Sequence, residues 1–297
     1  MSDDRHRIAA AGIAATVLAD GAELCSLTNA AGDEMLWQAG PVWPRHAPVL
    51  FPIVGRLADD TLRHEGRSYR LTQHGFARDR RFRWSGRSDT ACHLVLEDDA
   101  ATRASFPFAF RFEIGFAVAD ATLLVTYSVH NPAAETLPAS FGAHPALRWP
   151  LRAGAAKSGH TLTFAAPEPA PIRRLAGGLI LPERFASPVA GRRLHLDESL
   201  FAADAIILDQ VASDSVQFAA PDGPAIEMTW HGFRQLGLWM RPGGDFLCIE
   251  PWHGHADPVG FAGPFTEKPG LLHIPPGGEA RASYAIRLMV DAENRSA

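Results

Sequence analysis

A glutamate, two histidines and an aspartate lie close together in the segment FLCIEPWHGHADP, residues 246–258. Side chains of these types either transfer protons in general acid/base catalysis or ligate a metal ion. Alternate residues of a strand share a face, and this rule places His253, His255 and Asp257 together. Glu250 falls out of phase with them. The spacing therefore predicts that the glutamate does not share a site with the three later residues.

The cluster of His253, His255 and Asp257 has the residue types of a catalytic zinc site, which usually takes three protein ligands. Gly254 and Pro258 in the same stretch favour a loop rather than a rigid strand. No HExxH motif and no cysteine-rich segment elsewhere in the chain supplies partner ligands. We therefore predict no metal site, although the sequence leaves metal binding by this cluster open.

Glu250 follows a run, residues 246–249, that is apolar on both faces, as in a central strand of a β-sandwich. If the carboxyl group is buried, desolvation raises its pKa towards the range that suits a general base. Pro251 comes next and cannot donate a backbone hydrogen bond, so we expect the strand ladder to end there. The carboxylate is then either a rim residue or a partly buried base.

Three other segments place a polar side chain beside apolar residues: VLFPIVGRLADD (49–60) with Arg56, LTQHGFARDRRF (71–82) with His74, and PASFGAHPALRWP (138–150) with His144. The proline after His144 biases the histidine backbone to extended or turn conformations. Its imidazole can donate or accept a proton near neutrality, although a lone histidine among apolar residues is more often structural.

Several enzyme classes lack their sequence signals in this chain. There is no GxSxG for a serine nucleophile, and no phosphate-binding loop or dinucleotide fingerprint. Paired carboxylates for glycoside hydrolysis, Glu250 with Asp204, remain open because the sequence gives no distance between them.

The elements that must position these residues are strands, because the dominant hydrophobic period is two. Alternation is clearest in residues 110–119, 122–130, 225–230, 235–240 and 282–290. Turn signals rich in Gly, Pro, Asn and Asp separate these runs, and no amphipathic helix of ten or more residues stands out. We predict an all-β protein, a large antiparallel β-sandwich that forms a single domain over residues 1–297.

Composition indicates which classes of partner and which cellular compartment the protein is expected to have. The chain of 297 residues has a formal net charge of -5, which argues against a nucleic-acid partner. The one dense basic run, RDRRFR at 78–83, is interpreted as solvated, and residues 5–23 as the first strands rather than a signal peptide. No apolar run is long enough for a membrane helix. Three cysteines without a CxxC motif favour reduced thiols and a cytoplasmic location.

Six segments together resemble the aldose 1-epimerase (galactose mutarotase-like) family, nearest its bacterial LacX-like branch. They are GAELCSL (21–27), PVLFPIVGRL (48–57), QHGFARD (73–79), GAHPAL (142–147), LFAADAIIL (200–208) and FLCIEPWHGHAD (246–257). They occur in the order of the family and span nearly the whole chain. Any one segment is a weak signal, whereas VGR, HGFARD, HPA and CIEPW in combination are specific.

The resemblance implies a supersandwich fold and the interconversion of α and β anomers of a free sugar, without cofactor or metal. It implies that Glu250 is the catalytic base and His144 the catalytic acid. His74 corresponds to a second histidine near the ring oxygen, and Arg56 and Asp204 correspond to residues that bind sugar hydroxyls. The expected partner is a small sugar, and the expected assembly is a monomer or homodimer.

The chemistry fits these residue types. Anomer exchange removes a proton from the C1 hydroxyl and delivers one to the ring oxygen, as a carboxylate and a protonated imidazole can do. Trp239 and Trp252 either stack on the sugar or belong to the core. One alternative is a hexose-6-phosphate mutarotase, with RDRRFR and Arg45 as a phosphate site. Another is a non-catalytic carbohydrate-binding β-sandwich, which the presence of both proton-transfer residues disfavours.

Overall fold

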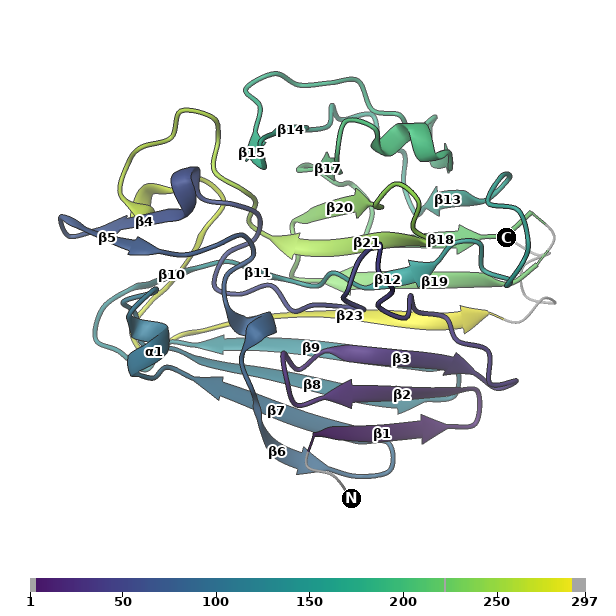
Figure 1. The fold of residues 1–297 in the computed structure, drawn as a ribbon, viewed down its shortest axis with the longest axis horizontal. Helices are drawn as coiled ribbons and strands as arrows, with labels where there is room; N and C mark the ends of the chain where they lie inside the picture. The colour runs from purple at the N-terminus through teal and green to yellow at the C-terminus, as the bar shows by residue number, and fades with distance from the viewer. Residues whose placement is uncertain (1–3, 222, 290–297) are drawn as a thin grey trace.

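Nine antiparallel strands form the largest sheet in the computed structural model, which describes residues 4–221 and 223–289. In spatial order they are β16 (Arg193–His195), β13 (Thr161–Phe164), β18 (Ser215–Ala219), β19 (Ala225–His231), β23 (Glu279–Met289), β9 (Thr122–His130), β8 (Arg111–Ala119), β7 (Ala91–Glu97) and β6 (Arg83–Arg87). Figure 1 shows this sheet running across the width of the molecule, with two smaller sheets in front of it or beside it.

Two smaller antiparallel sheets complete the main layers. The first contains β1 (Arg5–Ala10), β2 (Ile13–Leu18) and β3 (Leu24–Asn29), and it contacts β8 and β9 of the large sheet. The second has the order β11 (Phe141–Gly142), β21 (Phe246–His253), β20 (Gln235–Trp239) and β17 (Ile206–Leu208), and β12 (Ala146–Arg148) also pairs with β21. We call this second sheet the site sheet.

The remaining elements are short. Three two-stranded ribbons are β4 (Thr61–His64) with β5 (Arg67–Arg70), β10 (Leu137–Ala139) with β22 (Leu272–Ile274), and β14 (Leu175–Ala176) with β15 (Leu179–Ile180). The helical turns are α1 (Ala100–Arg103), η1 (Ala58–Asp60), η2 (Ala77–Asp79), η3 (Glu198–Phe201) and η4 (Phe265–Glu267). None of the helices within the described residues has the length or apolar character needed to cross a bilayer.

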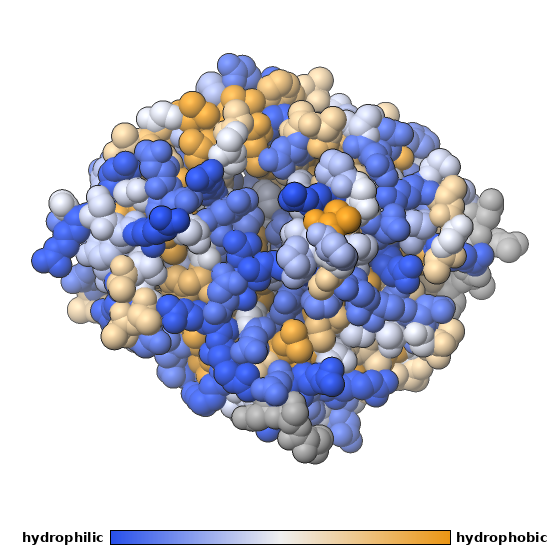
Figure 2. Space-filling model, viewed as in Figure 1, coloured by the Kyte–Doolittle hydropathy of each residue, from blue (hydrophilic) through white to orange (hydrophobic). Residues whose placement is uncertain are grey.

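Alternating side chains build the core, as the period-two pattern predicts. Along β9, Leu123, Val125, Tyr127 and Val129 are buried, whereas Leu124 on the opposite face is 41% exposed. The buried residues meet aromatic side chains from facing segments, and burial of each large side chain contributes about 1.5–3 kcal/mol. The outward faces are polar, and Figure 2 shows a largely hydrophilic surface with apolar residues in small groups.

The predicted antiparallel β-sandwich is confirmed, and each of the five alternating runs forms a strand of the structure, with residue 290 of the last run outside the described residues. Residues 5–23 form β1 and β2 and lead into β3, in agreement with their interpretation as the first strands. Cys25, Cys92 and Cys248 are all free.

The prediction that the ladder ends at Pro251 is wrong, because β21 continues to His253. The Pro251 carbonyl accepts a hydrogen bond from the Ala143 amide at 3.1 Å. The N–H and C=O groups of one strand residue point to the same side, so the missing donor would face residues 143–145. These residues lie between β11 and β12, where the ladder on that side is already interrupted.

Candidate active site

A pocket of about 260 Å³ lies on the outer face of the site sheet. Strand β21 separates it from the core: Leu247 and Ile249 point into the main core, whereas Glu250 and Trp252 line the pocket. The volume is close to the lower end of the usual range for small-molecule sites, about 300–1,000 Å³. A single small ligand is therefore the appropriate occupant.

Glu250 and His144 meet at the floor of this pocket, with His144 Nε2 3.2 Å from Glu250 Oε2. The break between β11 and β12 brings the histidine there. These strands pair with residues 252–253 and 246–248 of β21, so the connection between them passes Glu250. Trp43 stacks on the imidazole with ring centroids 5.2 Å apart and an interplanar angle of 28°. Backbone pairing thus positions His144 beside Glu250, and the stacked ring of Trp43 restrains the orientation of the imidazole.

Burial dominates the electrostatics of this pair. It raises the pKa of Glu250 well above its usual range; the Trp252 indole opposes this rise and the Asp204 charge adds to it. Burial likewise lowers the pKa of His144, and together with the positive charges of Arg78 and Arg45 it brings the pKa to about 3. Both shifts disfavour separated charges, so the two groups hold one proton between them at neutral pH.

His74 lies beside this pair, with its ring centroid 5.7 Å from that of His144. The Gly55 amide donates to His74 Nδ1 at 3.1 Å, and the His74 amide donates to the Gly55 carbonyl at 2.8 Å. Burial, and then the proximity of His144, lowers the pKa of His74 well below its ordinary value. The ring is therefore neutral, and because Nδ1 accepts from the Gly55 amide its proton is on Nε2, which lies 3.3 Å from the side-chain amide of Gln73.

A tight turn gives His74 this orientation. His74 has φ of 65°, in the left-handed region that costs a non-glycine residue energy. The next residue, Gly75, has φ of 71°, and a Cβ there would lie 2.3 Å from the Phe51 carbonyl oxygen. Only glycine fits this approach, which explains the local sequence QHGF.

Asp204 also lines the pocket, whereas Arg56 does not. The Asp204 carboxylate accepts a hydrogen bond from the Ala205 amide at 2.8 Å, and its backbone adopts φ of 65°. Arg56 donates through Nε to Asp60 at 2.8 Å, and its Cδ lies behind the pocket residue Gly178. The structure thus brings together four of the five sequence-predicted site residues and places Arg56 behind the wall.

Other lining residues were not identified from the sequence as site residues, among them Trp43, Gln73 and Arg241. Arg78 also lines the pocket; the sequence named it only within RDRRFR, as part of a solvated run or of a phosphate site. The interpretation of this run as solvated is wrong for Arg78. The Arg78 side chain is 18% exposed and donates to the Gln73 carbonyl at 2.6 Å. Arg78 lies within turn η2 (Ala77–Asp79), and the available sequence signal was the interpretation of RDRRFR as a phosphate site. Trp43 lies in a loop and had no such signal.

The side chains of His253, His255 and Asp257 make contacts in different directions. His253 stacks on Phe141 at 6.2 Å, and His255 Nδ1 lies 2.8 Å from the Ala256 carbonyl oxygen. Among the described residues, these three do not bring their ligand atoms within 4.8 Å of one another. Their contacts are those of residues that stabilise the loop around the pocket.

Asp257 is the link between two loops. Its carboxylate accepts a hydrogen bond from the Ala58 amide at 2.9 Å and lies 3.7 Å from the ammonium group of Lys268. Its backbone amide donates to the Arg56 carbonyl at 2.8 Å. Residues 253–270 are thus attached to the loop that carries Gly55 and hence to His74.

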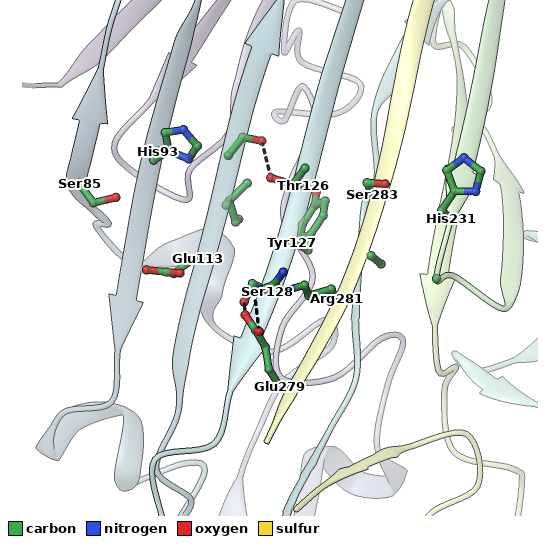
Figure 3. A pocket seen from close by; sticks show the side chains of 14 residues that line it. Ser85, His93, Glu113, Thr126, Tyr127, Ser128, His231, Glu279, Arg281 and Ser283 are labelled. Carbon is green, nitrogen blue, oxygen red and sulfur yellow. Dashed lines mark hydrogen bonds and ion pairs between the residues drawn. The ribbon is translucent and has the colours of Figure 1, made fainter. Parts of the chain in front are cut away.

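A larger hollow of about 610 Å³ lies on the outer face of the nine-stranded sheet (Figure 3). Small polar side chains from β9 and β23 form its floor, and His93 and His231 stand on opposite sides. Its charged groups are already paired: Glu279 accepts from Ser128 and forms an ion pair with Arg281 at 2.8 Å. The candidate active site is therefore the smaller pocket, where a carboxylate faces an imidazole.

Comparison with known proteins connects this arrangement to one family. Residues 4–267 match the sequence pattern of the family described as aldose 1-epimerase. Protein LacX of Lactococcus lactis subsp. lactis is 28% identical over 281 residues, which cover 91% of this chain and 94% of the relative.

Two solved structures are similar over almost their whole length. A galactose mutarotase related enzyme from Lactobacillus acidophilus is 30% identical, with a TM-score of 0.90, and the match covers 97% of this chain and 98% of that one. A galactose mutarotase-like protein from Lactobacillus casei is 28% identical, with a TM-score of 0.89 and coverages of 96% and 100%.

Proposed function

Because the chain belongs to the aldose 1-epimerase family, we propose that it interconverts the α and β anomers of a free hexose. The observation that carries this proposal is the contact of His144 Nε2 with Glu250 Oε2, 3.2 Å apart at the floor of a small pocket. A carboxylate and an imidazole that share one proton can exchange protons with two oxygens of the same sugar.

The proposed reaction balances its protons without a redox step. In the reactive form the shared proton is on His144: Glu250 takes the proton of the C1 hydroxyl while His144 gives its proton to the ring oxygen, and the bond from C1 to the ring oxygen breaks. Rotation about the C1–C2 bond of the open aldehyde exposes its other face. Ring closure then reverses both proton transfers, so the pair returns to its initial state with one proton. Each acid or base of this kind contributes about 10²- to 10⁴-fold in rate.

Neighbouring side chains would orient the sugar. His74 offers a hydrogen-bond donor at Nε2, which suits the lone pairs of the ring oxygen or a hydroxyl group. Asp204 offers an acceptor, and Trp239 and Trp252 offer apolar ring faces at the pocket wall. Arg56 would reach sugar hydroxyls only after leaving Asp60, so we propose that it supports the wall at Gly178.

The test follows the optical rotation of freshly dissolved α-glucose and α-galactose. We expect the wild type to accelerate the approach to equilibrium, and Glu250→Gln to lose most of this acceleration with its fold retained. Glu183→Gln is the matched control, because Glu183 is exposed and outside the pocket. Equal rates with and without wild-type protein for both sugars would refute the proposal for them.

A phosphorylated hexose is the second candidate substrate, and Arg78 favours it. This arginine lines the pocket, and its buried Nε has no hydrogen-bond partner within the described part of the chain. Arg241 lies at the same pocket, and Arg45 is close enough to affect the pKa of His74. A phosphate or another anionic substituent would supply the missing acceptor.

Comparison of glucose with glucose 6-phosphate decides between the two substrates. If the phosphate binds Arg78, Arg78→Gln raises KM for the phosphorylated sugar and leaves KM for glucose nearly unchanged. Arg83→Gln is the control, because the Arg83 side chain is 64% exposed and outside the pocket. A higher kcat/KM for glucose than for its phosphate would exclude this second candidate.

A further inference from the structure

Cys248 lies next to the proton-transfer pair, where the proposed reaction has no use for it. It precedes Glu250 by two residues on β21, so both side chains project from the same face of the strand. One ligand atom from each of His144, Cys248 and Glu250 lies within 4.8 Å of the other two, and all three residues are buried. Thiol, imidazole and carboxylate thus converge on one point.

These three donors are the ligand types of zinc. Bond lengths of about 2.0–2.3 Å in a tetrahedral site place the ligand atoms roughly 3.3–3.7 Å apart. His144 Nε2 and Glu250 Oε2, 3.2 Å apart, already stand near that separation. The Cys248 sulfur lies within 4.8 Å of a ligand atom of each of these residues and needs only a small adjustment to join them.

An unsatisfied polar atom at the same place provides further support. Glu250 is 1% exposed, and its Oε2, 3.2 Å from His144 Nε2, has no hydrogen bond of acceptable geometry within the part of the chain that the structure describes. A buried carboxylate oxygen without a hydrogen bond is costly, and a cation would relieve that cost.

We propose that Zn²⁺ binds to His144, Cys248 and Glu250 and reversibly inhibits the enzyme. Apolar side chains, with Phe246 and Ala146 beside the cysteine, close the inner side, whereas His144 and Glu250 border the pocket. The fourth coordination position therefore faces the pocket and is left for water or a sugar hydroxyl. The thiol proton and the proton that His144 and Glu250 share pass to solvent as the ion binds to the three donors, so binding releases two protons.

The bound ion would occupy the lone pairs that the proposed reaction needs. Glu250 could no longer accept the proton of the C1 hydroxyl, and His144 could no longer deliver one from Nε2. Binding of the ion depends only on the three donors, whereas the inhibition rests on the proposed function. The two are separable, because metal binding can be measured without a sugar.

The binding experiment uses purified, chelator-treated protein with zinc chloride or cobalt chloride. We expect wild type to bind zinc with one site and to develop a thiolate-to-cobalt charge-transfer band with Co²⁺. Cys248→Ser is expected to lose the band and to bind zinc at least about tenfold more weakly. Cys25→Ser is the matched control and is expected to behave as wild type, since Cys25 lies on β3 and donates to the Thr16 carbonyl.

A second variant of a proposed zinc ligand keeps the test valid if Cys248→Ser does not fold. Glu250→Gln leaves the thiol in place and is expected to keep the cobalt band but weaken zinc binding. Equal zinc affinity in wild type and both variants, or no charge-transfer band in wild type, would overturn the site.

The activity experiment measures zinc inhibition by polarimetry. Cys248→Ser is expected to keep the uninhibited rate and to resist zinc, because Cys248 takes no part in the proposed reaction. Equal inhibition of this variant and wild type would overturn the inhibitory role. Metal binding that depends on Cys248 in a protein without anomerase activity would leave the site standing and remove only the proposed function.

Discussion

His144 Nε2 lies 3.2 Å from Glu250 Oε2 because β11 and β12 both pair with β21 and the chain between them crosses the glutamate. The relative position of the two side chains is thus set by the backbone pairing of the strands on either side of His144. A substitution of one of the two residues is therefore expected to leave the other in place.

His144→Asn is expected to lower kcat for anomer exchange by about 10²- to 10⁴-fold, because the amide cannot deliver a proton. KM is expected to change little, since the asparagine still offers a hydrogen bond. Polarimetry at several sugar concentrations separates the two parameters. His195→Asn, on the exposed edge strand β16, is the control. An unchanged kcat would remove His144 from the role of acid.

Gly75→Ala is expected to destabilise the protein by more than about 1 kcal/mol, because its Cβ would overlap the Phe51 carbonyl oxygen. Gly66→Ala separates this overlap from backbone strain. Gly66 has φ of 73°, close to the 71° of Gly75, but a Cβ there meets nothing within 4 Å. Urea unfolding measures both variants. Equal losses of stability would show that backbone strain alone accounts for the effect.

Lys268→Met is expected to cost about 3–5 kcal/mol, because it leaves the buried Asp257 carboxylate without its cation. Removal of both charges in Asp257→Asn/Lys268→Met should cost less than Lys268→Met alone. Urea unfolding of the two single variants and the double variant gives the coupling energy. Additive losses would mean that the pair, although 3.7 Å apart, does not interact.

His253 is expected to make stability depend on pH. Burial lowers its pKa to about 4 in the folded protein, and the positive charge of Arg234 contributes to the shift. The unfolded chain therefore binds more protons from this residue between about pH 6.5 and 4, and the stability present above pH 6.5 is lost as the pH falls.

Urea unfolding of wild type and His253→Asn across this range isolates the contribution of that residue. The slope for wild type should exceed that of the variant by up to about 1.4 kcal/mol per pH unit. Identical slopes would show that His253 titrates alike in the folded and unfolded states.

Much of the fold was readable from local patterns. The alternation in residues 122–130 predicted β9 with the bounds that the structure has, because one face of that strand is buried and the other is not. The prediction that the ladder ends at Pro251 failed because a missing N–H donor interrupts a ladder only where a neighbouring strand offers an acceptor for it. Only the pairing of β11 and β12 shows that no donor is required there.

The sequence by itself determined the strand pattern, the glycine after His74, and the identity of residues able to transfer protons. Tertiary structure alone decided that Glu250 meets His144, that Arg56 stays behind the wall and that Arg78 turns inward. It also decided that Cys248, rather than His253 or His255, shares a site with the glutamate. The physical reason is that hydrophobic periodicity acts between near neighbours in the chain. Distances between side chains from separate strands depend on the register and crossing of the whole sheet.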